Sequence, residues 1–94
     1  MVAKVKIIIP SLLSKVTGGE KEVAVSAATL TEALRQLIAK YGDAFEERVF
    51  DSTGKPKGLL NFYINGKNVH FLKGVETQLK DGDEVLILPA VGGG

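Results

Sequence analysis

The side chains that could support catalysis are few in this chain of 94 residues. It contains no cysteine and a single histidine, His70, so thiol catalysis and a zinc site built from several Cys or His ligands are excluded. No second base or carboxylate pair stands near His70 in the sequence, and we expect it to be a surface or half-buried residue. We therefore predict no catalytic residue and no metal ligand.

Two short motifs resemble ligand-binding loops only in part. Residues 81–84 are Asp-Gly-Asp-Glu, but they lack the twelve-residue spacing and the closing glutamate of a calcium loop. Gly18-Gly19 is not followed by Lys-Ser or Lys-Thr and does not have the spacing of a dinucleotide-binding loop. We interpret both as turns, the first with solvated carboxylates.

The carboxyl end of the chain is its most distinctive chemical feature. A final apolar run ends at Pro89, and residues 90–94 then read Ala-Val-Gly-Gly-Gly. Proline cannot donate to a sheet ladder, so it is expected to release the chain into an extended tail. Residues 89–94 reach roughly 20 Å when extended, and glycines without side chains can enter a narrow channel. A glycine-rich end also fits a frayed terminus, so its interpretation depends on the fold that precedes it.

The composition is balanced in charge. Lysine and arginine total 12 residues, and aspartate and glutamate total 11, so the chain offers no positive field for a polyanion and no electrostatic support for nucleic-acid binding. The first residues contain no apolar signal segment, and no apolar run approaches the length of a membrane span. With no cysteine present, these features favour a cytoplasmic protein that does not bind membranes and is a monomer when free.

Residues 29–41 are predicted to form the main helix. Thr29 and Glu32 have the spacing of a capping box, in which each side chain satisfies a backbone N–H at the helix start. Apolar residues then recur at every third or fourth position and form one apolar stripe. Gly42 can adopt the positive φ that ends a helix. A further short helical turn is expected in residues 43–50.

Alternation of apolar residues with others predicts strands at residues 4–9, 22–25, 60–64 and 84–88. Asn65-Gly66 follows the third of these and predicts a hairpin into a short strand at residues 67–69. The first and last strands are the most apolar, so we expect them to lie side by side at the centre of the sheet. Pro89 is expected to end the last strand.

These elements predict an α+β fold in which one main helix covers one face of a mixed sheet of four to five strands. This arrangement is the β-grasp of ubiquitin-like proteins. We expect one domain over residues 1–91, followed by a flexible glycine tail at residues 92–94.

Several segments resemble a known family. Residues 79–85, residues 88–91 and the closing Gly93-Gly94 are similar to the end motif of the ubiquitin-like sulfur carriers, which include the molybdopterin synthase small subunit and the thiamine-biosynthesis sulfur carrier. The branch that includes the actinobacterial cysteine-biosynthesis carrier is favoured by four further segments, at residues 9–10, 17–19, 61–66 and 71–74. Gly92 departs from the Ala, Ser or Thr that such carriers often have there, and from the Arg of ubiquitin.

The resemblance implies chemistry at Gly94. An E1-like adenylating enzyme would activate the Gly94 carboxylate with ATP, and a sulfur donor would convert it to a thiocarboxylate. Gly92 and Gly93 would thread this group into a partner's active site, where the sulfur is donated in cysteine or molybdopterin biosynthesis. The chain would then be a protein co-substrate and not an enzyme, and it would bind no cofactor, because ATP is used by the activating partner.

Docking to such partners requires a surface near the tail. We expect it on the sheet face away from the helix, with Ile8 from the first strand and either Tyr63 or Phe62, depending on the register; Phe62 is the better candidate for the core. Leu88 is the leading candidate, because its family counterpart contacts the activating enzyme. The full set of expected docking residues is Ile8, Leu88, Pro89, Ala90 and Val91.

The expected partners are the E1-like enzyme and a sulfur-accepting synthase, either cysteine synthase or the molybdopterin synthase large subunit, with a zinc isopeptidase as a further possibility. Two other functions stay open. The chain could be a ubiquitin-like modifier, joined through Gly94 to lysines of other proteins. It could also be a β-grasp interaction domain whose glycines are incidental.

Overall fold

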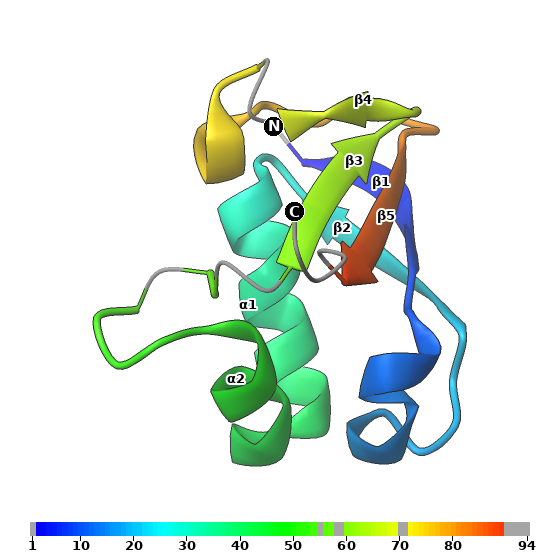
Figure 1. Cartoon of the computed structure of the whole chain (residues 1–94). Coiled ribbons are helices and arrows are strands. Elements are labelled where there is room, and N and C mark those ends of the chain that lie inside the picture. The colour runs from blue at the N-terminus through cyan, green and yellow to red at the C-terminus, as the bar shows by residue number, and fades with distance from the viewer. Residues whose placement is uncertain (1, 55, 58–59, 70–71, 90–94) are drawn as a thin grey trace.

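The computed structural model describes residues 2–54, 56–57, 60–69 and 72–89. In this part of the chain a five-stranded mixed sheet, in the order β2-β1-β5-β3-β4, packs one face against helix α1 (Figure 1). The predicted α+β class is confirmed. The elements in chain order are β1 (Ala3–Ile8), the 3-10 helix η1 (Ser11–Val16), β2 (Glu22–Ala27), α1 (Leu30–Tyr41), α2 (Asp43–Val49), β3 (Leu60–Ile64), β4 (Lys67–Asn68), the 3-10 helix η3 (Gly74–Glu76) and β5 (Glu84–Pro89).

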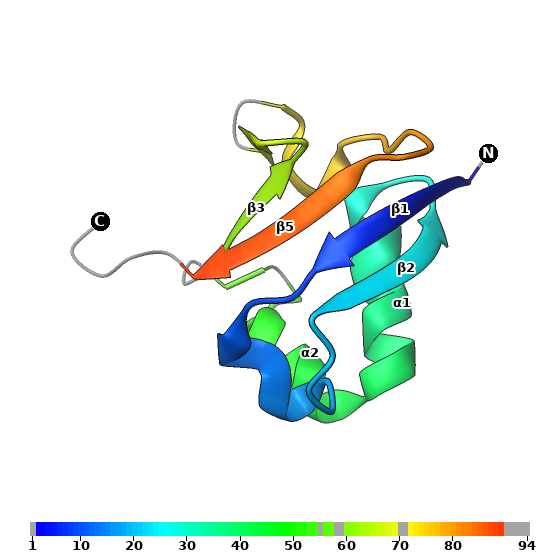
Figure 2. The same ribbon diagram turned by 90° about the vertical axis from the view of Figure 1, so that its right-hand side faces the viewer.

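The first and last strands form the centre of the sheet, as predicted. β1 and β5 run parallel, with Ile7 beside Val85 and Ile8 beside Leu86. β2 pairs antiparallel with the other side of β1, and β3 pairs antiparallel with the other side of β5 (Figure 2). Because β1 and β5 are parallel, both end at the same edge of the sheet, and the carboxyl end of β5 lies near the point where β1 leads into η1.

The inward face of this central pair forms the core with α1. Ile7, Val85 and Ile87 are fully buried, and so are the helix residues that make up most of the predicted apolar stripe. Those helix residues are Leu30, Ala33, Leu34 and Leu37. The sheet and the helix therefore hide one apolar surface between them, which accounts for the two-layer arrangement.

The predicted capping box opens α1. Thr29 Oγ1 accepts a hydrogen bond from the Glu32 N–H at 3.3 Å, and Glu32 Oε2 accepts one from the Ala28 N–H at 2.7 Å. The glutamate thus caps the residue before Thr29. Gly42 follows the helix with φ of 87°, a value that glycine adopts without a steric penalty.

Three segments add to or extend what the sequence predicts. The sequence predicts no element for residues 11–16, yet they form η1, which buries Leu13. The short turn expected at residues 43–50 is a seven-residue α-helix, α2, whose Phe45 and Val49 are fully buried. β5 ends at Pro89, as predicted, but it runs one residue beyond the expected range 84–88, because Pro89 still pairs with Leu60.

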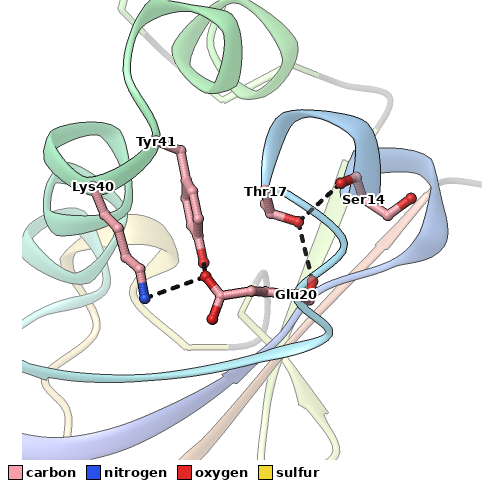
Figure 3. A network of polar contacts seen from close by, with 5 residues as sticks. All are labelled: Ser14, Thr17, Glu20, Lys40 and Tyr41. Carbon is pink, nitrogen blue, oxygen red and sulfur yellow. Dashed lines mark hydrogen bonds and ion pairs between the residues drawn. The ribbon is translucent and has the colours of Figure 1, made fainter.

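A polar network joins the segment after η1 to the end of α1 (Figure 3). The buried Thr17 hydroxyl lies 3.0 Å from the carbonyl oxygen of Glu20 and 3.3 Å from that of Ser14, so it holds the turn closed. The Glu20 carboxylate accepts a hydrogen bond from the Tyr41 hydroxyl at 2.8 Å and lies 3.3 Å from the Lys40 ammonium. The network fixes the loop between η1 and β2 against the helix.

The same contacts change the acidity of two groups. The hydrogen bond from Tyr41, followed by that from Lys40, holds the pKa of Glu20 below its usual value. Partial burial, followed by the hydrogen bond to Glu20, raises the pKa of Tyr41 to about 12. Because the folded-state pKa of Glu20 is lowered, its stabilising contribution is present above the unfolded-state pKa and is lost as the pH falls through the folded-state value.

Replacing Tyr41 with phenylalanine tests this network. In Tyr41→Phe the largest cause of the Glu20 shift is gone, so the pKa of Glu20 should rise toward its usual value, as measured by NMR titration of its side-chain carboxyl carbon. Stability should also fall less steeply on acidification than in the wild type. Tyr63→Phe is the matched control and should leave the Glu20 titration unchanged. An unchanged pKa of Glu20 in Tyr41→Phe would contradict the assignment.

Candidate docking site at the end of the last strand

β5 carries the chain to the base of its predicted tail. The strand lies between β1 and β3, so Pro89 ends a central strand and not an edge strand. The expected site residues Ala90, Val91, Gly92, Gly93 and Gly94 lie outside the described residues. The structure therefore places the base of the tail, and the functional surface within reach is the one around the end of β5.

The face of the sheet away from α1 carries an apolar patch beside this base. The register sets Ile8, Leu86 and Tyr63 in one row across β1, β5 and β3. Leu88 stands two residues further along β5 on the same face, with Asn61 beside it. Ile8, Tyr63, Leu86 and Leu88 are called the docking patch below.

The members of the docking patch are unequally exposed. Leu88 leaves 38% of its surface open, and the other three side chains are half-buried by their neighbours on the same face. An apolar side chain as exposed as Leu88, next to three others, is typical of a small interaction surface. Both expected docking residues on this face that the structure describes, Ile8 and Leu88, are therefore brought together.

The register also decides between Phe62 and Tyr63. Phe62 pairs with Ile87, is 4% exposed and faces the helix, whereas Tyr63 pairs with Leu86 on the open face. Leu86 is the patch residue that the sequence reasoning missed. Its position two residues before Leu88 was the one signal in the sequence, since side chains two residues apart on a strand lie on the same face.

Charged residues border the patch on one side. The Lys6 ammonium lies 3.3 Å from the Glu22 carboxylate across β1 and β2, and Glu84 stands beside Lys6 in the register of β5. The Lys6 and Glu22 side chains are each about half exposed, at 54% and 56%, so their ion pair contributes little to stability. They mark the polar limit of the apolar surface.

A buried aspartate fixes the start of β5. We expected solvated carboxylates in residues 81–84, but Asp83 is only 9% exposed. Its Oδ1 accepts from the side-chain amide of Asn65 at 2.8 Å, and its Oδ2 accepts from the Lys80 N–H at 2.8 Å. The Asn65 side-chain oxygen in turn accepts from the Glu84 N–H at 2.9 Å. Asp83 therefore ties the turn before β5 to the turn after β3.

The predicted Asn65-Gly66 hairpin makes this contact possible. Asn65 has φ of 51° and Gly66 has φ of 86°, the left-handed conformations that a tight turn between β3 and β4 requires. On the other side of β5, the Lys6 N–H donates to the Asp83 carbonyl at 3.0 Å. The register of β5 is thus held on both sides, which keeps Leu86 and Leu88 on the open face.

The loss of the Asp83 carboxylate should destabilise the fold. Asp83→Ala removes the acceptor of two part-buried hydrogen bonds, so we expect the free energy of unfolding to fall by about 1–3 kcal/mol, measured by urea denaturation. Glu47→Ala changes an exposed acid on α2 and should stay within about 0.5 kcal/mol of the wild type. Equal stability of the two variants would show that Asp83 does not fix β5.

Among the described residues there is no group of three or more His, Cys, Asp or Glu side chains that could hold a metal ion. His70 lies outside the described residues. In the same part of the chain no helix is long and apolar enough to cross a membrane. The docking patch itself is an apolar surface of the kind that suits contact with another protein.

The mixed sheet packed on α1 places the chain in the class of ubiquitin-like β-grasp proteins. Residues 7–94 match the ThiS family, and the chain belongs to that family. It is 42% identical over 92 residues to the sulfur carrier protein CysO of Mycobacterium tuberculosis, an alignment that covers 96% of this chain and 98% of CysO.

Solved structures agree with this assignment. The small archaeal modifier protein 1 (SAMP1) of Methanosarcina acetivorans is 34% identical, with a TM-score of 0.87 over 100% of this chain and 99% of that one. A chain of the Amycolatopsis orientalis BexX/CysO complex is 36% identical, with a TM-score of 0.83 over 96% of this chain and 99% of that one. The predicted resemblance to ubiquitin-like sulfur carriers and the β-grasp fold are confirmed.

Proposed function

We propose that this chain carries sulfur as a thiocarboxylate on Gly94. The observation that carries the proposal is the end of a central strand, Pro89, beside an exposed apolar patch in a chain of the ThiS family. The fold supplies a rigid base and a surface for docking, and the tail supplies the reacting carboxylate. This division of labour fits a protein co-substrate that positions one atom in the active site of a partner.

The activation would proceed in two steps. The Gly94 carboxylate attacks the α-phosphorus of ATP in an E1-like enzyme, which forms an acyl adenylate and releases pyrophosphate. A sulfur donor then attacks the acyl carbon, and AMP leaves as the thiocarboxylate forms. Adenylation is needed because a carboxylate offers no good leaving group. ATP is bound and used by the partner, and the carrier holds no cofactor of its own.

The docking patch is the surface that we assign to the activating enzyme. It is apolar, lies on the open face of the sheet and begins one residue before Pro89. A partner that covers Leu88 and Leu86 would therefore hold the base of the tail in a fixed position. Ala90 and Val91 would extend the contact, and Gly92 and Gly93 would thread toward the active site.

Cysteine biosynthesis is the pathway that we favour for the sulfur. The identity of 42% with CysO over nearly the whole chain supports it, with a cysteine synthase as the acceptor and a zinc isopeptidase as a further partner. The A. orientalis structure, in which BexX is in complex with CysO, supports a direct contact between such a carrier and a second protein. Donation in molybdopterin biosynthesis, to a synthase large subunit, is the alternative. We place the protein in the cytoplasm.

A second candidate function is conjugation to other proteins. The similarity to the modifier SAMP1, with a TM-score of 0.87, favours it, and conjugation through Gly94 begins with the same adenylation. The two functions differ in the nucleophile that attacks the adenylate or its derivative. A sulfur donor gives a thiocarboxylate, whereas a lysine amine gives an isopeptide bond.

Intact-mass measurement distinguishes these functions. The chain is incubated with an E1-like enzyme from its own organism, ATP and a sulfide source. A mass increase equal to the replacement of one oxygen by sulfur, localised to Gly94 by fragmentation, is expected for the carrier. Removal of Gly93-Gly94 should abolish the shift. High-mass conjugates without this shift would favour the modifier, and no change in any ATP-dependent assay would leave only an interaction domain.

Truncation of Leu88 tests the docking patch. Leu88→Ala should lower kcat/KM for ATP–pyrophosphate exchange about tenfold, because a central apolar contact is lost in the complex. The melting temperature should change little, since Leu88 is 38% exposed. Leu72→Ala is the matched control, because Leu72 is a leucine of the same exposed fraction, 38%, outside the patch. Equal activation of the two variants would refute the docking assignment.

A further inference from the structure

Strand β2 has a free edge. In the sheet of the described residues β2 is the outermost strand on one side and pairs only with β1 (Figures 1 and 2). A six-residue strand, Glu22–Ala27, is long enough to serve as a template for another extended chain. The edge therefore offers directional backbone hydrogen bonds that the docking patch does not.

The register identifies which backbone groups point outward. The N–H of Ile9 donates to the carbonyl of Lys21 at 2.8 Å, so these two residues form a hydrogen-bonded pair of the antiparallel ladder. Such pairs recur at every second residue, so the backbone N–H and C=O groups of Val23 and Val25 point toward β1. The N–H and C=O groups of Glu22, Ala24 and Ser26 consequently face away from the sheet.

One of these outward groups already accepts a hydrogen bond from outside the sheet. The side-chain amide of Gln36, on α1, donates to the Ser26 carbonyl. Both groups of Ala24 and the N–H of Ser26 remain available at the edge. A shallow depression of about 450 Å³ lies here, lined by Lys4, Ala24, Val25, Ser26 and Gln36.

The charges around the edge favour an acidic occupant. The nearby carboxylates already have partners. Glu22 pairs with Lys6, and Glu20 binds Lys40 and Tyr41. Glu32 accepts from the Ala28 N–H, and Asp81 accepts from the backbone N–H of Lys4 at 2.8 Å. In contrast, the exposed ammonium groups of Lys4 and Lys21 have no ion-pair partner among the described residues. Lys21 directly precedes β2, and Lys4 stands beside Ser26 near its far end.

We propose that the free edge of β2 binds an extended peptide segment of a partner protein that carries acidic residues at both ends. The segment adds a strand to the sheet through both backbone groups of Ala24 and the N–H of Ser26, and its acidic ends meet Lys21 and Lys4. This site is distinct from the docking patch, because β1 separates β2 from β5. A partner can therefore occupy the edge while Leu86 and Leu88 remain free.

The probe is a synthetic peptide, Glu-Glu-Val-Ile-Val-Glu-Glu, titrated into the full-length chain and followed by amide NMR and hydrogen exchange. In the free protein the outward amides of Ala24 and Ser26 should exchange faster than those of Val23 and Val25. Saturating peptide should slow the exchange of the Ala24 amide about tenfold or more. A peptide with lysines in place of the glutamates should bind about tenfold more weakly.

Two kinds of variant separate backbone pairing from charge. Ala24→Pro removes one outward N–H that is not hydrogen-bonded to β1, so the affinity for the peptide should fall about tenfold. Ala24→Ser keeps this N–H and should bind the peptide with the wild-type affinity. Lys4→Gln with Lys21→Gln leaves the backbone intact and should weaken binding and flatten its dependence on salt. Lys73→Gln with Lys80→Gln removes the same charge from exposed sites elsewhere and should bind as the wild type does.

Three results would overturn the proposal. Shifts confined to Ile8, Tyr63, Leu86 and Leu88 would show that the peptide binds the docking patch. Unchanged affinity in the Lys4→Gln, Lys21→Gln variant would exclude the acidic class of partner even if Ala24→Pro fails to fold. Protection of the Ala24 amide that rises with protein concentration in the absence of peptide would assign the edge to a second copy of this chain. None of these results bears on the thiocarboxylate at Gly94.

Discussion

The parallel pairing of β1 with β5 is the constraint on which the rest of the structure depends. Because side chains alternate between the two faces of a strand, this one register sends Ile7, Val85 and Ile87 into the core and leaves Ile8, Leu86 and Leu88 on the open face. A slip of one residue would exchange the two sets. Asp83, which is hydrogen-bonded to Asn65 and Lys80, opposes such a slip at the start of β5. The core and the docking patch are therefore specified by the same contacts.

A central strand is also the most suitable element to carry a reactive tail. A tail that leaves an edge strand would share the fraying of that edge, whereas β5 pairs with β1 over residues 84–86 and with β3 over residues 85–89. The two-sided pairing anchors the strand, and the pairing with β3 holds it as far as Pro89. Glycines contribute almost no side-chain contacts to a partner, so the affinity has to come from the folded surface beside them. For this reason an exposed leucine at position 88, directly before Pro89, is a better candidate for partner binding than an equally exposed leucine elsewhere.

The sequence predicted those features that depend on local periodicity. The capping box at Thr29, the apolar stripe of α1 and the Asn65-Gly66 turn each depend on residues close together in the sequence, and all three are present. The central position of the first and last strands also followed, because the two most apolar strands belong at the centre. The membership of the docking patch was harder to derive. Residues 85–88 are uniformly apolar, so only the register separates the buried Ile87 from the exposed Leu88.

What the sequence could not show are the contacts between distant residues. Asp83 looked like a solvated turn residue, because its partner Asn65 lies 18 positions away. Residues 11–16 have no apolar period, and η1 is held instead by the burial of Leu13 and by the network that joins Thr17, Glu20 and Tyr41. The pairing of Pro89 with Leu60 likewise became visible only once β3 was placed beside β5.

The two surfaces of the sheet place different restrictions on a partner. The docking patch is an apolar face, and apolar contact alone leaves a partner some freedom to rotate about the normal to the sheet. A strand added at the edge of β2 lies in the plane of the sheet, and its hydrogen bonds fix one direction. A partner that contacted both the docking patch and the edge of β2 would restrict rotation of the carrier about two axes. Either contact alone would leave rotation about one axis free. In the proposed function the reacting group is the Gly94 carboxylate, so orientation of the folded base is the main means by which this chain would direct it.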